Sequence, residues 1–187
     1  MGALGAPYPF VIYSDLSNIK AFLTGVVNSG FSGILWTPEV RGGETEKELL
    51  RRLQMVTFSV QCLINAWCCP EIPWLKFNCV DKVKEILGER KKLIPKLKAA
   101  FDKYRETGVP PVRALVMDYT DDPETFDVDD EYLFCENLLV APFTDFVSDS
   151  REVYLPEGEW TDFFTGEPVP CGRFTYTSEN IPVFRRK

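Results

Sequence analysis

The stretch from residue 31 to residue 67, FSGILWTPEVRGGETEKELLRRLQMVTFSVQCLINAW, carries the pattern that decides the fold. Residues 31–36 form an apolar run, which predicts a buried strand, and we expect Pro38 to end it. After a polar, Gly-containing loop and one helical segment, residues 60–67 form a second apolar run. This run predicts another strand, so the stretch has the order strand, helix, strand.

The segment between the two strands carries a helix start signal. Thr45 is a suitable N-cap and Glu48 follows three residues later, which is the spacing of a capping box, so we expect a helix that runs to about Phe58. Upstream, residues 8–14 predict a further strand, and apolar residues at helical spacing then predict a helix that Gly30 stops. The resulting alternation of strands and helices is typical of parallel βαβ units.

The character of the chain changes near residue 108. Residues 80–107 predict one long helical stretch in which Pro95 should kink or restart the helix. After it come short strand-like runs separated by turn sequences, which is the pattern of antiparallel sheets. We therefore expect an α/β region over residues 1–107 and an all-β domain over residues 108–187.

Composition limits the functions that need to be considered. The chain has 187 residues, 45% of them hydrophobic, and a formal net charge of −7, which argues against nucleic acid or an anionic membrane as a partner. It contains no histidine, so a Ser-His-Asp, Cys-His or His-ligated metal site cannot form. The six cysteines lack paired C-x-x-C spacing, and we expect neither a metal nor a cofactor. A leader sequence and a membrane span are not apparent, which favours a cytoplasmic location.

Several segments together resemble the C-terminal part of glycoside hydrolase family 31, the α-glucosidase and α-xylosidase family. They are GFSGILWTPEVRGG, ELLRRLQMVTFS, EYLFCENLLVAPF and REVYLPEGEWTDFFTG, in that order along the chain. The resemblance implies that residues 1–107 are the last three strands and helices of a (β/α)8 (TIM) barrel. It implies that residues 108–187 are the antiparallel β-sandwich domain that follows this barrel. Since such a barrel takes about 250 residues, it also implies that the chain is incomplete.

The resemblance also suggests catalytic residues. Retaining glycosidases use two carboxyl groups about 5 Å apart, one as nucleophile and one as acid/base. The family's nucleophile motif, of the type W-x-D-M-N-E, does not occur in these residues. Asp15, at the end of a predicted strand, is the candidate acid/base; its alternative role is to cap the helix that follows. A further possibility is a thiol-dependent enzyme that uses Cys68 and Cys69, but no His or Asp partner motif accompanies these cysteines.

Candidate sugar-binding residues follow from the same alignment of motifs. Glu39 matches the family's acidic residue in the first sugar subsite, with Arg41 in place of a glycine; alternatively, Glu39 is a solvated loop carboxylate paired with Arg41. Asn65 stands where the family commonly has a sugar-binding histidine and can bond a hydroxyl group. Trp67 and Trp74 lie beyond strand ends, where they could stack on a sugar ring.

Two functions remain open from the sequence. The first is a family 31-type hydrolase of O-glycosidic bonds, with an α-glycoside as its ligand, that is weak or inactive alone because this chain lacks the nucleophile. The second is a non-catalytic remnant that binds carbohydrate or a partner. In either case unpaired strand edges predict self-association, or docking on a chain that supplies the missing barrel strands.

Overall fold

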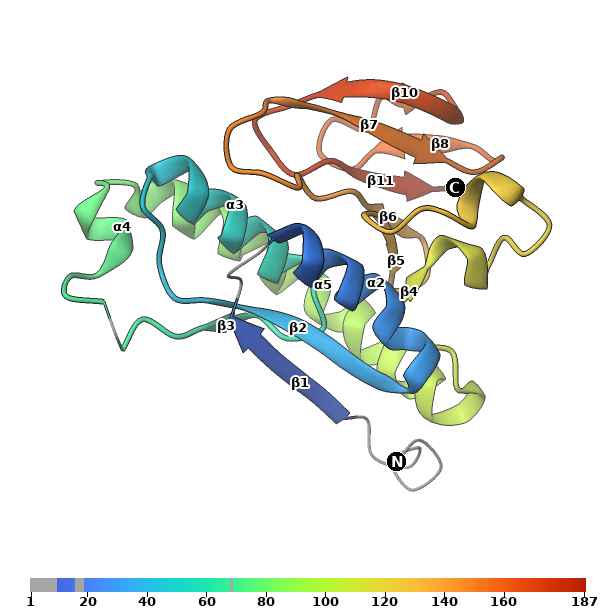
Figure 1. Cartoon of the computed structure of the whole chain (residues 1–187), viewed down its shortest axis with the longest axis horizontal. Coiled ribbons are helices and arrows are strands. Elements are labelled where there is room, and N and C mark those ends of the chain that lie inside the picture. The colour runs from blue at the N-terminus through green and yellow to red at the C-terminus, as the bar shows by residue number, and fades with distance from the viewer. Residues whose placement is uncertain (1–9, 16–18, 68) are drawn as a thin grey trace.

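The computed structural model describes residues 10–15, 19–67 and 69–187, although the side chains of residues 10–15 and of residue 38 lie outside this description. Figure 1 shows three groups of elements: a small sheet, a set of helices on one side of it, and antiparallel strands beyond the helices. The fold thus combines helices and strands, and antiparallel sheets make up its C-terminal part. Among the described residues, no helix has the length and apolarity needed to cross a membrane.

The N-terminal elements alternate between strand and helix. In chain order they are β1 (Phe10–Asp15), α2 (Ile19–Ser32), β2 (Ile34–Val40), α3 (Glu46–Thr57), β3 (Leu63–Ile64), α4 (Pro73–Lys76) and α5 (Val80–Thr107). The three strands form one sheet in the order β1-β2-β3, and both pairings are parallel. The predicted βαβ units are therefore present. β3 has only two residues, so the strand predicted over residues 60–67 is mostly loop.

The C-terminal elements are short strands with two 3-10 turns. They are β4 (Val112–Ala114), η1 (Leu115–Met117), η2 (Pro123–Thr125), β5 (Tyr132–Phe134), β6 (Leu138–Val140), β7 (Ser150–Leu155), β8 (Trp160–Asp162), β9 (Pro168–Val169), β10 (Gly172–Thr177) and β11 (Val183–Arg186). Six of them form an antiparallel sheet in the order β4-β5-β6-β11-β8-β9, and β10 pairs with β7 in a second sheet.

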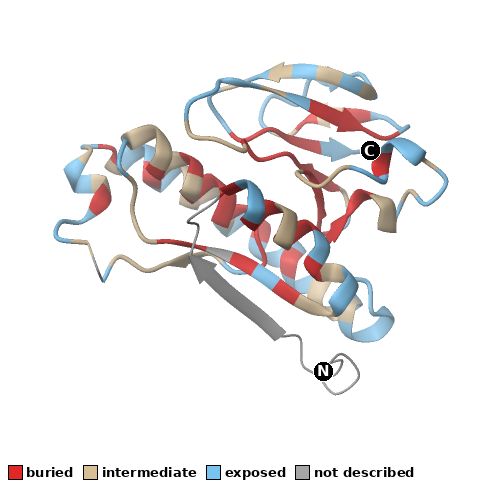
Figure 2. Ribbon diagram, viewed as in Figure 1, coloured by how far each residue is buried: buried red, intermediate tan, exposed pale blue. Residues whose placement is uncertain are grey.

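Strands β5 and β6 of the six-stranded sheet are buried on both faces (Figure 2), whereas β9 at the edge of the sheet and the end of β11 are exposed or half-buried. In β5, Tyr132 and Phe134 join a core that includes α2 and α5, whereas Leu133 between them joins the core shared with β7. Both faces of these strands thus need apolar side chains, which explains their uninterrupted apolar sequence. The helices before residue 108 and the strands after it share one hydrophobic core.

The role predicted for Gly30, the end of the first helix, belongs to Gly33 instead. Gly30 does not stop α2, which continues to Ser32; instead, a Cβ atom at Gly30 would lie 3.1 Å from the Val112 carbonyl oxygen and 3.1 Å from Pro110 Cγ. Gly30 therefore lets α2 approach β4 closely. Gly33, with φ of 69°, ends the helix because its backbone adopts the left-handed conformation that favours glycine.

Two prolines lie inside elements that continue past them. Pro38 does not end β2, which runs on to Val40. β2 pairs with β3 only from Glu39 onward, so the edge that faces β3 needs no donor from Pro38. Pro95 lies inside α5, which continues to Thr107 without a restart. Pro95 has no N–H group, so α5 lacks one backbone hydrogen bond at this point. Leu93 and Leu97, on either side of Pro95, are buried in the core and hold the helix in place.

Candidate functional site

The carboxyl ends of β1, β2 and β3 meet at one edge of the parallel sheet. Asp15 is the last residue of β1 and lies in register with Glu39, which in turn lies in register with Leu63. The backbones of Asp15, the candidate acid/base, and of Glu39, the candidate subsite residue, are therefore neighbours. The side chain of Asp15 lies outside the part of the chain that the structure describes. Figure 1 shows the strands running in parallel toward this edge.

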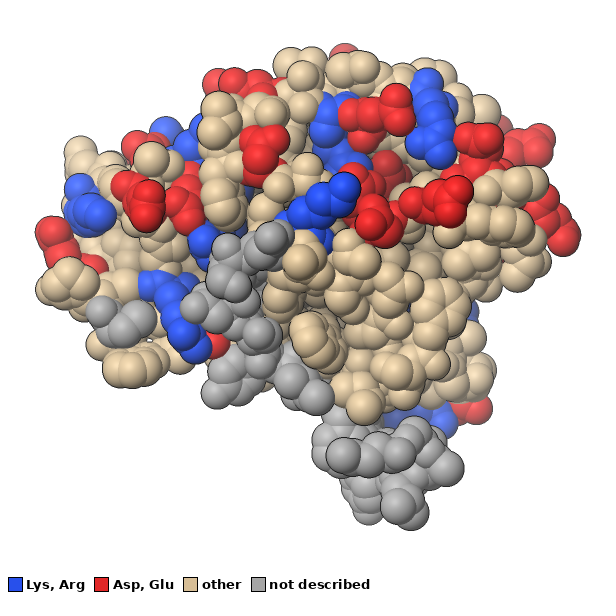
Figure 3. All heavy atoms as spheres, in the orientation of Figure 1, with Lys and Arg blue, Asp and Glu red and all other residues tan. Residues whose placement is uncertain are grey.

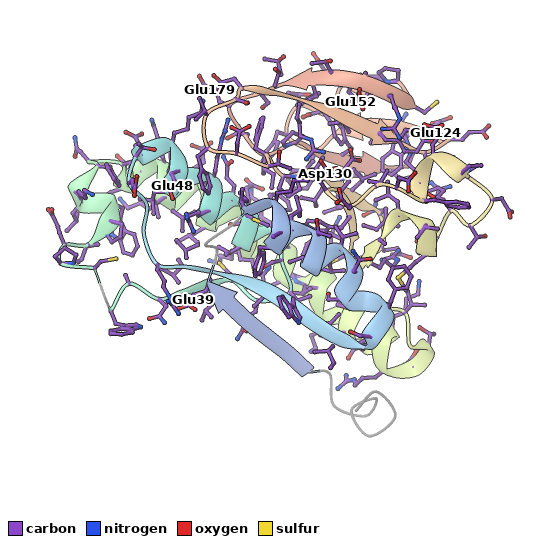
Figure 4. All side chains as sticks on the ribbon, viewed as in Figure 1. Glu39, Glu48, Glu124, Asp130, Glu152 and Glu179 are labelled. Atoms are coloured by element: carbon purple, nitrogen blue, oxygen red, sulfur yellow. The ribbon has the colours of Figure 1, made fainter. Side chains whose placement is uncertain are left out.

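Glu39 lies in a strand and is 0% exposed, so the alternative of a solvated loop carboxylate is wrong. Its pairing with Arg41 is present: Arg41 Nε donates to Oε1 at 3.2 Å and Nη2 donates to Oε2 at 3.3 Å. Glu39 is labelled at this edge in Figure 4. A buried carboxylate needs a charged or hydrogen-bonding partner, and the two-point contact with the guanidinium supplies it. Any ligand at this edge would thus meet Arg41 before it met Glu39.

A hollow of about 450 Å³ lies beside Arg41. Its wall includes Gly42, Gly43 and Cys69. Gly42 has φ of 141°, and a Cβ atom there would lie 3.2 Å from the Cys69 sulfur, so the loop after β2 and the loop after β3 approach each other closely. The Cys69 thiol donates to the Arg41 carbonyl oxygen at 2.5 Å and joins the two loops.

The start of α3 holds the loop on the other side of this hollow. As predicted, the Thr45 side chain accepts a hydrogen bond from the Glu48 N–H. Glu48 Oε2 accepts from the backbone N–H of Glu44 at 2.9 Å rather than from that of Thr45, and Glu48 Oε1 lies 2.8 Å from Arg52. Glu48 and Arg52 also line the hollow. The capping box identified Glu48 from the sequence, but no sequence signal indicated Arg52, and Cys69 was considered only as a reactive thiol.

The loop after β3 carries the remaining candidates. The Asn65 N–H donates to the Val40 carbonyl oxygen at 2.8 Å, which ties the start of this loop to the end of β2. Trp67 is 79% exposed, so one large aromatic side chain is open to a ligand. Trp74, by contrast, packs against the core cluster that contains Val40 and Leu49. The structure therefore gives Trp67 and Trp74 different environments.

The thiols nearby do not form a reactive group in the described part of the chain. Cys68 lies outside the described residues, and Cys69 donates its proton to a backbone carbonyl. Burial raises the pKa of the Cys62 thiol, which keeps it protonated near neutral pH. Within the residues that the structure describes, no group of three or more Cys, Asp or Glu side chains is arranged to hold a metal ion.

Comparisons with known proteins place the chain in a family. Residues 108–187 match the description "Glycosyl hydrolase family 31 C-terminal domain". Alpha-glucosidase 2 of Bacillus thermoamyloliquefaciens is 32% identical over 179 residues, which cover 89% of this chain and 22% of that protein. The alpha-xylosidase of Saccharolobus solfataricus is 30% identical over 189 residues, which cover 94% of this chain and 26% of that protein.

Solved structures agree with these relatives. The cycloalternan-degrading enzyme from Trueperella pyogenes, in complex with isomaltose, matches with a TM-score of 0.79 and 27% identity over 91% of this chain and 28% of that one. A GH31 alpha-xylosidase from a soil metagenome, complexed with xylose, matches with a TM-score of 0.77 and 27% identity over 88% of this chain and 29% of that one. The chain spans about a quarter of the length of each of these proteins. Its sequence and its fold together show that it belongs to glycoside hydrolase family 31.

Proposed function

We propose that this chain supplies one side of the sugar-binding site of an enzyme that hydrolyses α-glycosidic bonds. In this proposal residues 1–107 are the last three strands and helices of a (β/α)8 barrel, and residues 108–187 are the β-sandwich domain that follows it. The observation that carries the proposal is the meeting of three parallel strand ends beside the hollow at Arg41. Barrel enzymes bind their substrates at the carboxyl ends of the strands.

Asp15 is the proposed acid/base. It is the last residue of β1, and its backbone lies in register with Glu39 at the proposed binding edge. In a retaining mechanism it would protonate the glycosidic oxygen while a second carboxylate attacks the anomeric carbon, and it would then deprotonate the water that hydrolyses the glycosyl-enzyme. A motif for that second carboxylate is absent from the 187 residues. We therefore expect negligible turnover from this chain alone.

The other candidates have separate proposed roles. Arg41, which covers Glu39, would donate hydrogen bonds to the sugar, and Glu39 would hold the guanidinium in place. The Asn65 amide would bond a hydroxyl group. The exposed Trp67 would stack on the sugar ring, while Trp74 would support the wall of the site from the core.

A binding experiment tests this placement. We expect isomaltose to bind the chain saturably in isothermal titration calorimetry, and Trp67→Ala to weaken binding about tenfold because a stacked ring is lost. Phe31→Ala is the matched control, since Phe31 is also exposed but lies at the end of α2. Equal affinity for both variants would place the sugar elsewhere.

A turnover assay tests the catalytic part. The chain should release no nitrophenol above background from p-nitrophenyl α-glucoside. Turnover by the 187-residue chain that disappears in Asp15→Asn would show that a second carboxylate is present after all and would refute the expectation of inactivity.

One observation favours the alternative, a non-catalytic chain that binds carbohydrate or a partner. In the described structure β1 pairs with β2 alone, so its other edge offers unpaired backbone groups to another strand. A partner chain that adds strands at this edge would extend the sheet. Sugar binding without turnover, even in the presence of such a chain, would favour this alternative.

A further inference from the structure

A second, larger hollow lies on the other side of α3. It has a volume of about 640 Å³ and lies where α3 and α5 meet the loops of the antiparallel strands. It shares no lining residue with the hollow at Arg41, although α3 contributes to both. Its volume lies within the range of roughly 300–1,000 Å³ typical of small-molecule sites, which often form at junctions of this kind.

An aromatic ring lies in the wall of this hollow. Phe164, in the turn after β8, is 42% exposed. Its ring packs edge-on against Phe163 at a centroid distance of 5.1 Å and against Phe58 at 6.3 Å. The ring is therefore supported by the buried Phe58 and the half-buried Phe163 and offers an apolar surface of fixed orientation.

Charged groups at the hollow are mostly neutralised by one another, with an excess of acid. Five acidic residues and three basic residues line it, which gives a net charge of 3 − 5 = −2. The three basic residues all form ion pairs: Lys82 with Glu46 at 2.5 Å, Lys47 with Asp149 at 2.7 Å and Arg51 with Asp149 at 3.4 Å. Acidic and basic side chains are intermixed over α3 and the antiparallel strands in Figure 3.

Two carboxylates at the hollow keep their acceptor capacity. Among the described residues, neither Glu85 nor Glu179 has a basic group at ion-pair distance, and both side chains are exposed. Figure 4 labels Glu179, which belongs to the loop between β10 and β11. Glu85 comes from α5 across the hollow. Acceptors thus lie on both walls.

The side-chain amide of Asn180 adds hydrogen-bond donors to the lining of this hollow. Gln54 Nε2 donates to Asn180 Oδ1 at 2.9 Å, and Gln54 Oε1 accepts from the Ile181 N–H at 3.0 Å. This fixes the Asn180 side chain by its oxygen. Its NH2 group donates to no acceptor within the described structure, so it can donate to a ligand that enters the hollow.

We propose that this hollow is a second, non-catalytic binding site for a neutral oligosaccharide. The apolar ring suits the C–H face of a pyranose, and the carboxylates and the amide suit its hydroxyl groups. The net negative charge disfavours a phosphorylated or other anionic ligand. The ligand class follows from the lining of this hollow and does not depend on the proposed roles of Asp15 or Arg41.

Hydrogen–deuterium exchange of the 187-residue chain with and without maltotriose tests this site. We expect slower exchange in residues 160–166 and 176–182. Phe164→Ala and, separately, Glu179→Ala should reduce the affinity about tenfold. Phe126→Ala is the control, because Phe126 is exposed but lies next to η2 and does not line the hollow.

The possible outcomes separate this proposal from the proposed function. Slower exchange confined to residues 39–45 and 62–72 would support the site at Arg41 and refute the second site. Slower exchange in both sets of segments would support both sites, provided that Phe164→Ala abolishes the protection in residues 160–182 and leaves that in residues 39–45 and 62–72 unchanged. If spermidine, a cationic probe, protects residues 160–182 and maltotriose does not, the hollow is a cation site and the proposal is wrong.

Discussion

Glu131 is an acidic residue that folding removes from water. It lies directly before β5 and is 3% exposed. Oε1 accepts the Tyr154 N–H at 2.9 Å and lies 3.4 Å from Arg151, whereas Oε2 has no hydrogen-bond partner in the described structure. Burial, only partly offset by Arg151, raises the pKa of Glu131 to about 8. The folded protein therefore holds a proton there at neutral pH.

This proton makes stability depend on pH. The unfolded glutamate ionises near its ordinary pKa of about 4.3, so between that pH and about 8 the folded state binds more protons than the unfolded state. Stability should thus fall as the pH rises through this window. Glu131→Gln, which cannot ionise, should remove this dependence and raise the free energy of unfolding at pH 7.5 by on the order of 4 kcal/mol.

Urea denaturation of both proteins at pH 5 and pH 7.5 measures this effect. Glu152→Gln is the control, because Glu152 is exposed and, within the described part of the chain, its carboxylate pairs only with the half-exposed Arg173. If Glu131→Gln is less stable than the parent at pH 7.5, the carboxylate is ionised and its pairing with Arg151 stabilises the fold.

At the scale of the helix, two glycines should respond to the same substitution in opposite ways. Gly88 lies inside α5, and a Cβ atom there would meet nothing within 4 Å, so Gly88→Ala should stabilise the protein by about 0.5–1 kcal/mol. Gly30→Ala should destabilise it by about 1–3 kcal/mol, since its Cβ would press on Pro110 and the Val112 carbonyl. Thermal melting of both variants compares them directly. Two stabilising substitutions would mean that α2 can move away from β4.

Side chains of α3 bind the loop between β6 and β7 and hold it against the core. Arg51 is 4% exposed; its guanidinium lies 4.0 Å from the centre of the Phe143 ring, and it donates to the carbonyl oxygens of Asp145 and Ser148. Lys47 adds an ion pair with Asp149 at 2.7 Å. One face of α3 therefore determines the course of this loop.

Loss of the Arg51 side chain should consequently be costly. Arg51→Ala removes a buried ring contact and two bonds to carbonyl groups, and we expect a loss of about 2–4 kcal/mol. Arg173→Ala should cost less than about 1 kcal/mol, because its partners Glu124 and Glu152 are exposed and water screens such pairs. Chemical denaturation of the two variants tests the contrast. Equal losses would mean that burial does not determine the strength of these arginine contacts.

Sequence patterns predicted the elements whose cause is local. The alternation of parallel strands and helices and the cap at Thr45 follow from residue spacing, and the structure confirms them. The positions of Gly30 and Pro38 were misinterpreted because their roles depend on neighbours far away in the sequence: β4 packs against Gly30, and β3 pairs with β2 only beyond Pro38. Propensity alone does not contain such contacts.

The candidate site remains a prediction, but the position of its residues in the fold can be compared. The family resemblance selected residues that the structure places at one edge of the sheet, since Glu39 and Asn65 both lie at strand ends there. The burial of Glu39 beneath Arg41 could not be predicted. It depends on how the side chain of Glu39, near the end of β2, and that of Arg41, directly after β2, are oriented toward each other. Cys69 was missed as a link between the loops, since its thiol meets a carbonyl 28 residues away.

At the scale of the whole molecule, the two proposed domains are not independent. The face of the six-stranded sheet that carries Tyr132 and Phe134 packs on α2 and α5, so separation at residue 108 would expose apolar side chains on both parts. The Tyr132 hydroxyl also donates to the Phe58 carbonyl oxygen at 2.8 Å across this junction. Residues 19–187 should therefore unfold as one unit. The free edge of β1, in contrast, is the edge of the three-stranded sheet that faces away from β2.

The free edge of β1 makes self-association the expected behaviour of the chain, measurable as a concentration-dependent mass in light scattering. A proline tests the cause, because it cannot donate a backbone hydrogen bond. Successive residues of a strand direct their N–H groups toward opposite edges, so of Val11→Pro and Ile12→Pro one blocks the free edge and the other breaks the pairing with β2. The variant that keeps the circular dichroism spectrum should lose association, and the other should lose structure. If the parent chain is monomeric at all concentrations, or if neither variant changes its mass, the edge of β1 does not drive association.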